Sequence, residues 1–153
     1  MELLDTLLAK RLAGKLRSAR CLSAGALERI ENELVELGPP AIDCVKQCLS
    51  HGDARTPAMR VLDRLLSKDT LEGYLQALSS PNPAVASGVG KVLSRNRNYD
   101  AFRLVGLLAG SSTPKPTLEA ILREQADRIP PAHILQVFPQ LGKDGQAVAF
   151  RFL

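Results

Sequence analysis

Residues 39–68 read PPAIDCVKQCLSHGDARTPAMRVLDRLLSK, and residues 69–98 read DTLEGYLQALSSPNPAVASGVGKVLSRNRN. Each stretch carries a helical pattern of apolar residues, a polar break and a second helical pattern. The apolar positions of the two stretches correspond, which pairs Val45 with Tyr74, Leu49 with Leu78, Ala58 with Val89, Val61 with Val92 and Leu62 with Leu93. Self-similarity with a period of about 30 residues is typical of stacked helical hairpins, so the sequence predicts an all-α solenoid.

The composition favours the same fold class. The chain of 153 residues is long enough for one domain with a buried core, and 45% of its residues are hydrophobic. Aromatic residues make up only 4% and tryptophan is absent, whereas leucine and alanine are abundant. This balance favours packed helices over a β-sandwich. The net charge of +4 permits contact with acidic proteins or nucleic acid without requiring either.

Residues 1–38 precede the repeats, and we expect them to form two capping helices. Ser23 is placed to cap the second of these helices, which runs to about Leu37 and ends at Gly38. The first helix spans residues 1–20 and has an apolar stripe at helical spacing, which we expect to face the core: Leu3, Leu4, Leu7, Leu8, Leu12 and Leu16.

The basic, amphipathic character of this first helix also fits a membrane-surface helix or a mitochondrial presequence. Glu2 and Asp5 count against a presequence, and we favour the capping helix. Lys10 and Arg11 interrupt the leucine run, so no signal-peptide core is seen. No stretch reaches the roughly 18 consecutive apolar residues of a membrane span. We therefore expect a cytoplasmic protein.

Four repeats follow over residues 39–153, with boundaries at 39–68, 69–98, 99–130 and 131–153. Asp53 and Thr117 are placed to cap or brace second helices, and Gly88 and Gly90 predict the close approach of a neighbouring helix. The last repeat is predicted to be incomplete, because it ends on apolar residues, without a cap or a polar turn, where a solenoid normally has a polar terminal face. These residues, Phe150, Phe152 and Leu153, also make self-association through the C-terminal end a prediction.

The segments PNPAVASGVGKVL (residues 81–93) and DARTPAMRVL (residues 53–62) resemble the second-helix signature of HEAT repeats. They look most like the short bacterial kind called PBS-lyase-like HEAT repeats. The resemblance covers about residues 34–153 and implies a right-handed superhelix whose second helices line a concave face. HEAT families include scaffolds, regulatory subunits, nucleic-acid binders and a few enzymes, so the resemblance does not select a function.

The sequence predicts no catalytic, cofactor or metal site. Cys44 and Cys48 share one helix face, but the three cysteines and two histidines do not show the spacing of a zinc site. We interpret the three cysteines, Cys21, Cys44 and Cys48, as buried small apolar residues in a reducing compartment. His51 lies in a polar turn and His133 starts a helix, and neither has an evident acidic partner for catalysis. We therefore expect no enzyme activity.

Basic residues form the best candidate binding surface. Aligning the second helices of the first two repeats places Arg60 over Lys91 and Arg64 over Arg95, so the cations form a ladder. The third repeat has Ala120 in this place, and there the ladder stops. The predicted partner-binding residues, which we call the basic ladder, are Arg60, Arg64, Lys68, Lys91, Arg95 and Arg97.

This basic ladder predicts a non-catalytic protein–protein interaction scaffold that binds an acidic partner on the concave face. A nucleic-acid-binding module using the same residues is the first alternative, because a row of cations also suits a phosphate backbone. A regulatory subunit of an enzyme is the second. A merely solvated charged face remains the simplest interpretation of such a row.

Overall fold

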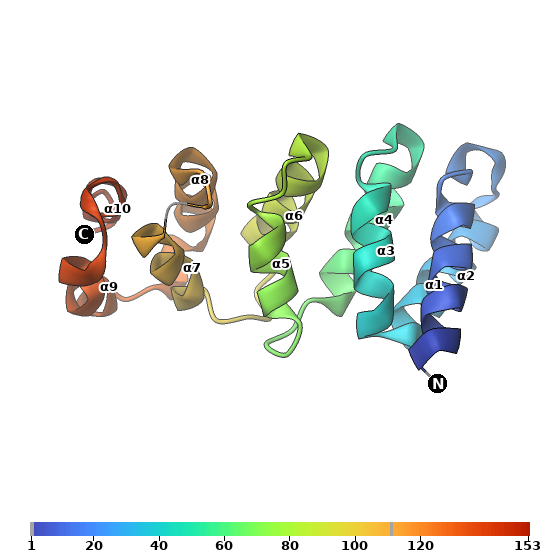
Figure 1. The fold of residues 1–153 in the computed structure, drawn as a ribbon, viewed down its shortest axis with the longest axis horizontal. Helices are drawn as coiled ribbons and strands as arrows, with labels where there is room; N and C mark the ends of the chain where they lie inside the picture. The colour runs from blue at the N-terminus through green and yellow to red at the C-terminus, as the bar shows by residue number, and fades with distance from the viewer. Residues whose placement is uncertain (1, 111) are drawn as a thin grey trace.

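The computed structural model describes residues 2–110 and 112–153, and all regular elements among them are helical (Figure 1). The predicted all-α class is confirmed. The α-helices are α1 (Glu2–Leu16), α2 (Ala24–Leu37), α3 (Ile42–Cys48), α4 (Arg55–Leu65), α5 (Leu71–Ala77), α6 (Pro83–Arg95), α7 (Phe102–Gly106), α8 (Lys115–Gln125), α9 (Pro131–Val137) and α10 (Lys143–Phe150). Short 3-10 turns extend several of them, including η4 (Leu107–Ala109) and η5 (Ala126–Arg128).

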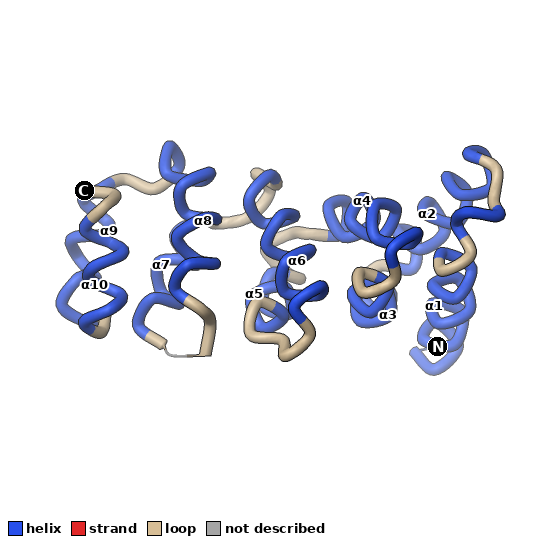
Figure 2. Tube along the Cα trace, turned by 90° about the horizontal axis from the view of Figure 1, so that it is seen from above, coloured by secondary structure: helices blue, strands red, loops and turns tan. Residues whose placement is uncertain are grey.

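Consecutive helices pair into hairpins, and the hairpins stand side by side in a row from α1/α2 to α9/α10 (Figures 1 and 2). The second helices α2, α4, α6 and α8 pack directly on one another. We call the solvent-facing surface of these four helices the second-helix face. The accessible surface of 8626 Å² exceeds the roughly 7,600 Å² expected of a compact protein of this mass, as a row of hairpins should.

Polar contacts between hairpins repeat at the sequence period. Most of the side-chain hydrogen bonds that join neighbouring hairpins link residues 29 to 35 positions apart. They include the ion pairs Arg103–Glu72 at 2.6 Å and Arg20–Asp53 at 3.4 Å. The period of the sequence is therefore also the spatial period of the described structure.

The carbonyl groups at the ends of second helices are satisfied by the following hairpins. The last carbonyls of any helix lack partners within that helix. The hydroxyl of Tyr74 donates to the Leu62 carbonyl at 2.7 Å, and that of Tyr99 donates to the Leu93 carbonyl. The buried amide of Gln125 donates to the carbonyls of residues 93, 94 and 96 at 2.8 to 3.0 Å. These bonds tie the C-terminal ends of α4 and α6 to the next hairpin.

Close helix approach is found at Gly88 and Gly145, of which only Gly88 was predicted. A methyl group added at Gly88 would lie 2.9 Å from the Cδ atoms of Leu49. A methyl group at Gly145 would lie 2.3 Å from the Leu108 carbonyl oxygen, a backbone atom of η4. The prediction for Gly90 was wrong, because a methyl group there would meet its neighbours at 3.8 Å, an ordinary contact distance.

One predicted helix cap is confirmed, whereas two other predicted caps and part of the predicted apolar stripe of α1 differ from the structure. Ser23 caps α2 as predicted, accepting a hydrogen bond from the Ala26 amide at 3.2 Å. Asp53, by contrast, does not cap α4, because its carboxylate pairs with Arg20 of the preceding hairpin. Thr117 does not cap α8, which already begins at Lys115, where the fixed backbone of the preceding proline starts the helix. On α1, the third case, only the last two leucines of the predicted stripe are buried.

We predict that Gly145→Ala destabilises the fold by about 2 kcal/mol or more, because the added methyl would collide with the η4 backbone and force α10 to move. Gly73→Ala is the matched control, since it lies within α5 with no heavy atom within 4 Å of the added methyl. It should stabilise the protein by up to about 1 kcal/mol through helix propensity. Urea unfolding of both variants measures the difference, and equal stabilities would contradict the packing of α10 on η4.

We also predict a specific acid sensitivity from the junctions of α8 with its neighbours. Hydrogen bonds from Arg151 and Arg97 lower the pKa of Glu119 and of Asp127 respectively. A carboxyl whose pKa is lowered by folding stabilises the protein above its unfolded pKa of about 4, and this contribution is lost as the pH falls through the lower folded pKa. Glu119→Gln/Asp127→Asn should therefore lose less stability than the wild type on going from neutral pH to about pH 3.

The control for this experiment is Glu124→Gln, which removes an exposed acid of α8 that has no ion pair among the described residues. It should retain the acid sensitivity of the wild type. The urea midpoints of the three proteins are measured at both pH values. If the double variant loses as much stability at low pH as the wild type does, these junctions are not the source of the acid sensitivity.

Candidate binding groove on the second-helix face

A groove runs between α4 and α6 on the second-helix face, and four charged residues lie along it. Its volume is about 350 Å³, and it is lined by Thr56, Met59, Arg60, Asp63, Lys91, Val92 and Arg95. Val92 is buried and Met59 half-buried, so the floor is apolar, while the charged side chains stand on the walls. The structure thus brings three of the six predicted ladder residues to one groove. We call this feature the basic groove.

Arg60 and Arg64 are engaged by α2, which the sequence interpretation missed. The Nε and Nη2 atoms of Arg60 donate to the two carboxylate oxygens of Glu31 at 2.8 and 3.1 Å. The Glu31 side chain is 10% exposed, against 51% for Arg60. This bidentate bond raises the pKa of Arg60 further above its usual value. Arg64 donates to the amide oxygen of Asn32 at 2.7 Å, so its charge is oriented and not neutralised.

Lys91 and Arg95 are both exposed, and no ion pair or side-chain hydrogen bond engages either of them within the described part of the chain. They follow one another at a spacing of four residues on α6, so their side chains lie one turn apart along the groove. Two unpaired cations next to each other repel, and an anion between them would relieve this repulsion. Lys91 and Arg95 are therefore the strongest candidates for binding an anion in the basic groove.

The other two ladder residues lie beside the basic groove, not in it. Lys68 is exposed beyond the C-terminal end of α4. Arg97 follows α6 and pairs with Asp127 of η5 at 2.7 Å, which raises the pKa of the Arg97 guanidinium. Its main-chain carbonyl also accepts from Arg128 at 2.9 Å. Arg97 is thus part of the junction between two hairpins.

Asp63 is the acid that lines the basic groove, and its carboxylate is held by Asn96. The Asn96 amide donates at 2.9 Å to both the carbonyl and the carboxylate oxygen of Asp63. Among the described residues, no ion pair joins Asp63 to the neighbouring arginines. Glu31 neutralises Arg60 instead, 29 positions earlier in the chain. The sequence period could have indicated this pair, since the residue one repeat before Arg60 is acidic.

Two of the cysteines and one of the histidines considered in the sequence pack against neighbouring residues of the fold. Burial raises the pKa of the Cys44 and Cys48 thiols, so both stay protonated near neutral pH, and the Cys48 thiol donates to the Ala13 carbonyl. Cys21 is exposed, so its predicted burial was wrong. The ring of His133 packs edge-on against Phe102 at a centroid distance of 5.6 Å. Within residues 2–110 and 112–153, no three His, Cys, Asp or Glu side chains are grouped so that they could hold a metal ion.

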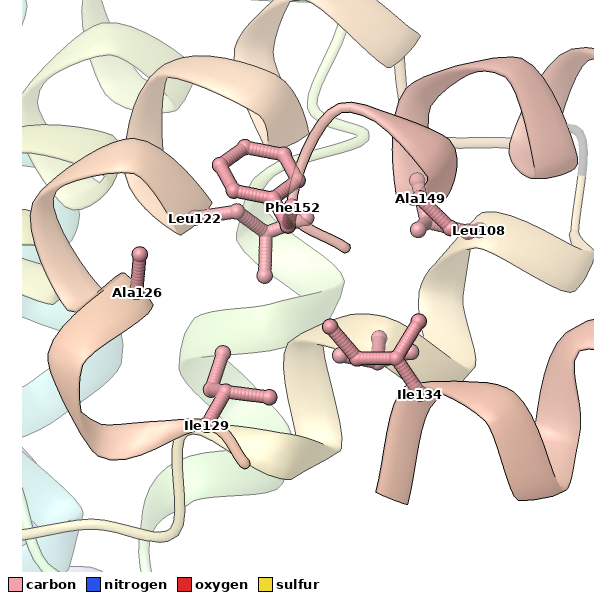
Figure 3. Close-up of a pocket in the computed structure, with 8 residues that line it drawn as sticks. Leu108, Leu122, Ala126, Ile129, Ile134, Ala149 and Phe152 are labelled. Carbon is pink, nitrogen blue, oxygen red and sulfur yellow. The ribbon is translucent and has the colours of Figure 1, made fainter. Parts of the chain in front are cut away.

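An enclosed space lies between the last two hairpins, and its walls are apolar (Figure 3). Its volume is about 10 Å³, roughly that of one water-sized probe. The lining residues come from four helices and their connections, and Figure 3 places Leu122, Ile134 and Phe152 around the space. Without polar partners, so small a space neither holds water nor admits a ligand. We interpret it as a gap in the core.

The chain matches no protein-family model, no curated protein and no solved structure. The HEAT-repeat resemblance therefore stays a prediction. Among the described helices, none combines the length and the hydrophobicity needed to cross a bilayer.

We predict that Glu31→Gln destabilises the protein by about 1 to 2 kcal/mol, because it weakens a largely buried, charge-assisted bond to Arg60. The same change should strengthen anion binding at the basic groove, because it leaves Arg60 without its counter-charge. Glu33→Gln removes an exposed acid of the same helix that pairs with no described residue, and it should change neither property. Thermal unfolding and titration with an acidic peptide measure the two effects; a Glu31 variant indistinguishable from the control would contradict the pairing.

Proposed function

We propose that this protein is a non-catalytic protein-binding scaffold whose basic groove holds an acidic segment of another protein. The observation that carries the proposal is the pair Lys91 and Arg95, which stands exposed beside an apolar floor without a counter-charge from the described chain. An extended segment carrying carboxylates and one or two apolar side chains would complement both features, since charges fix its register and apolar contacts supply affinity.

The distribution of charge favours a protein segment over nucleic acid. Of the six ladder residues, Arg60 and Arg97 are already paired with carboxylates and Arg64 is bonded to an amide. The rest are Lys68, Lys91 and Arg95, whereas proteins that track a nucleic-acid backbone commonly contact about six to ten phosphates. The acids of α2, Glu28 and Glu31, would also repel a backbone that extended along the second-helix face beyond α4. The basic groove is therefore a short anion-binding site.

The architecture that we propose for this function is a right-handed solenoid of HEAT-like hairpins acting in the cytoplasm, with the second-helix face on its concave side. The contacts between hairpins at sequence separations of 29 to 35 support a repeat of this length. A regulatory subunit of an enzyme would use the same surface, and its catalytic partner would then be the acidic protein.

The test is the binding of a labelled poly-glutamate peptide and of a single-stranded DNA of matched length, measured by fluorescence anisotropy at low and physiological salt. Lys91→Glu/Arg95→Glu should weaken peptide binding by about tenfold or more, because each lost charge pair and each new repulsion acts at close range. Lys10→Glu/Arg11→Glu on α1 is the matched control, since it makes the same charge change away from the basic groove. It should leave peptide affinity within about twofold of the wild type, because screening confines charge effects to about 10 Å.

Pull-down from native lysate with the same three proteins, with and without nuclease, then identifies the natural partner. A protein that survives nuclease treatment and is lost only with the groove variant is the expected result. Equal peptide binding by both variants would remove the basic groove from the account, and tighter, groove-dependent binding of the DNA would replace the proposal by nucleic-acid recognition.

A further inference from the structure

The first helix differs from the first helix of the other hairpins in length. It has 15 residues, whereas α3, α5 and α9 have 7 each. The C-terminal half of α1 does the packing, through the buried residues Ala9, Leu12, Ala13 and Leu16. The N-terminal half is an additional segment at the end of the row (Figure 1).

Leucines of this additional segment face solvent. Leu3, Leu4, Leu7 and Leu8 are 74%, 71%, 54% and 45% exposed. At 100° per residue they lie on the side of α1 opposite to its buried positions, so the packing of α1 on the rest of the fold cannot cover them. In α2 to α8, no large apolar side chain of the described residues is exposed to this degree. We call these four residues the leucine quartet.

Cations continue the same face of the helix. Lys10, Arg11 and Lys15 are exposed and follow the leucine quartet at spacings of three and four residues, so they lie on its side of α1. Asp5 lies toward the core side and is half-buried. Among the described side chains, the outward face of α1 therefore combines four leucines and three cations without a carboxylate.

We propose that α1 docks this face on an anionic lipid bilayer, with the leucine quartet in the boundary between headgroups and acyl chains. Leucines at one end and lysine or arginine beside them are the elements of an interfacial helix, in which apolar burial and attraction to anionic headgroups act together. Docking in the plane of the surface does not need a spanning helix, in agreement with the absence of one from the described chain.

The charges separate this occupant from a second copy of the chain. Two copies joined through their leucine quartets would offer no counter-charge to the three cations from this face, because its described side chains include no carboxylate. An anionic bilayer presents the opposite charge over a continuous surface, and a helix can lie on that surface without a groove shaped to receive it. The docking face is also separate from the basic groove, which lies between α4 and α6, so a docked protein keeps that groove available.

The test is co-sedimentation of the whole chain with phosphatidylcholine vesicles, with and without phosphatidylserine. The wild type should bind the vesicles that contain phosphatidylserine and bind those of phosphatidylcholine alone at least about tenfold more weakly. Leu4→Ser/Leu8→Ser should lower binding to the anionic vesicles about tenfold or more, and Lys10→Glu/Arg11→Glu should do the same. Lys91→Glu/Arg95→Glu is the control and should bind the vesicles as the wild type does. All substituted side chains are exposed, so thermal unfolding should be unchanged.

Absence of wild-type binding to anionic vesicles would overturn the proposal, and so would binding that survives the leucine substitutions. Light scattering without vesicles tests whether a second copy of the chain covers the leucine quartet instead. Self-association that disappears in Leu4→Ser/Leu8→Ser would assign the leucine quartet to a second copy. The two proposals rest on different residues, the leucine quartet with its cations and the basic groove, so failure of one leaves the other standing.

Discussion

The structure depends on the direct packing of successive second helices. A single hairpin of this length cannot bury its apolar face alone, and it becomes stable only between neighbours that cover both sides. Helix α4 shows the constraint, because Ala58, Val61 and Leu62 are fully buried where α4 lies between α2 and α6. Each hairpin must therefore present matching apolar positions one repeat later, and this requirement produces the periodicity of the sequence.

Polar groups fit into this packing by bonding to the neighbouring repeat. The side-chain amide of Gln125 donates hydrogen bonds to carbonyls at the end of α6. The guanidinium of Arg128 stacks on the Tyr99 ring at 5.1 Å and donates hydrogen bonds to main-chain carbonyls between two hairpins. The same arrangement divides the basic ladder. A cation that pairs with an acid one repeat away, such as Arg60, becomes part of a junction, whereas a cation that forms no such pair, such as Lys91, stays available to a partner.

Local sequence patterns predicted the helical class and the Ser23 cap, because these follow from apolar periodicity and from short-range hydrogen bonding. Local patterns do not give the contacts across hairpins. The clearance at Gly145 depends on where η4 lies, and the partner of Arg60 is found only by comparing residues one repeat apart. The leucines of α1 were expected in the core for a related reason: their spacing marks a helix, but spacing alone does not distinguish one apolar face from two.

Repetition also explains why the basic groove forms where it does along the second-helix face. The α2 helix supplies acids to one side of α4, and α8 supplies Ala120 where a third cation would extend the ladder. Between α4 and α6, by contrast, two helices contribute unpaired or partly exposed cations to the same apolar floor. The groove is thus defined as much by neighbouring residues that neutralise charge as by the cations themselves.

The most direct test is small-angle X-ray scattering of the monomer, because the second-helix face and the basic groove both require hairpins that stand in a row. The row predicts a radius of gyration clearly above the roughly 15 Å of a compact chain of this length, with a distance distribution extended toward long separations. A radius at that compact value with a symmetric distribution would mean that the hairpins fold back on one another, and it would contradict both the second-helix face and the groove on it.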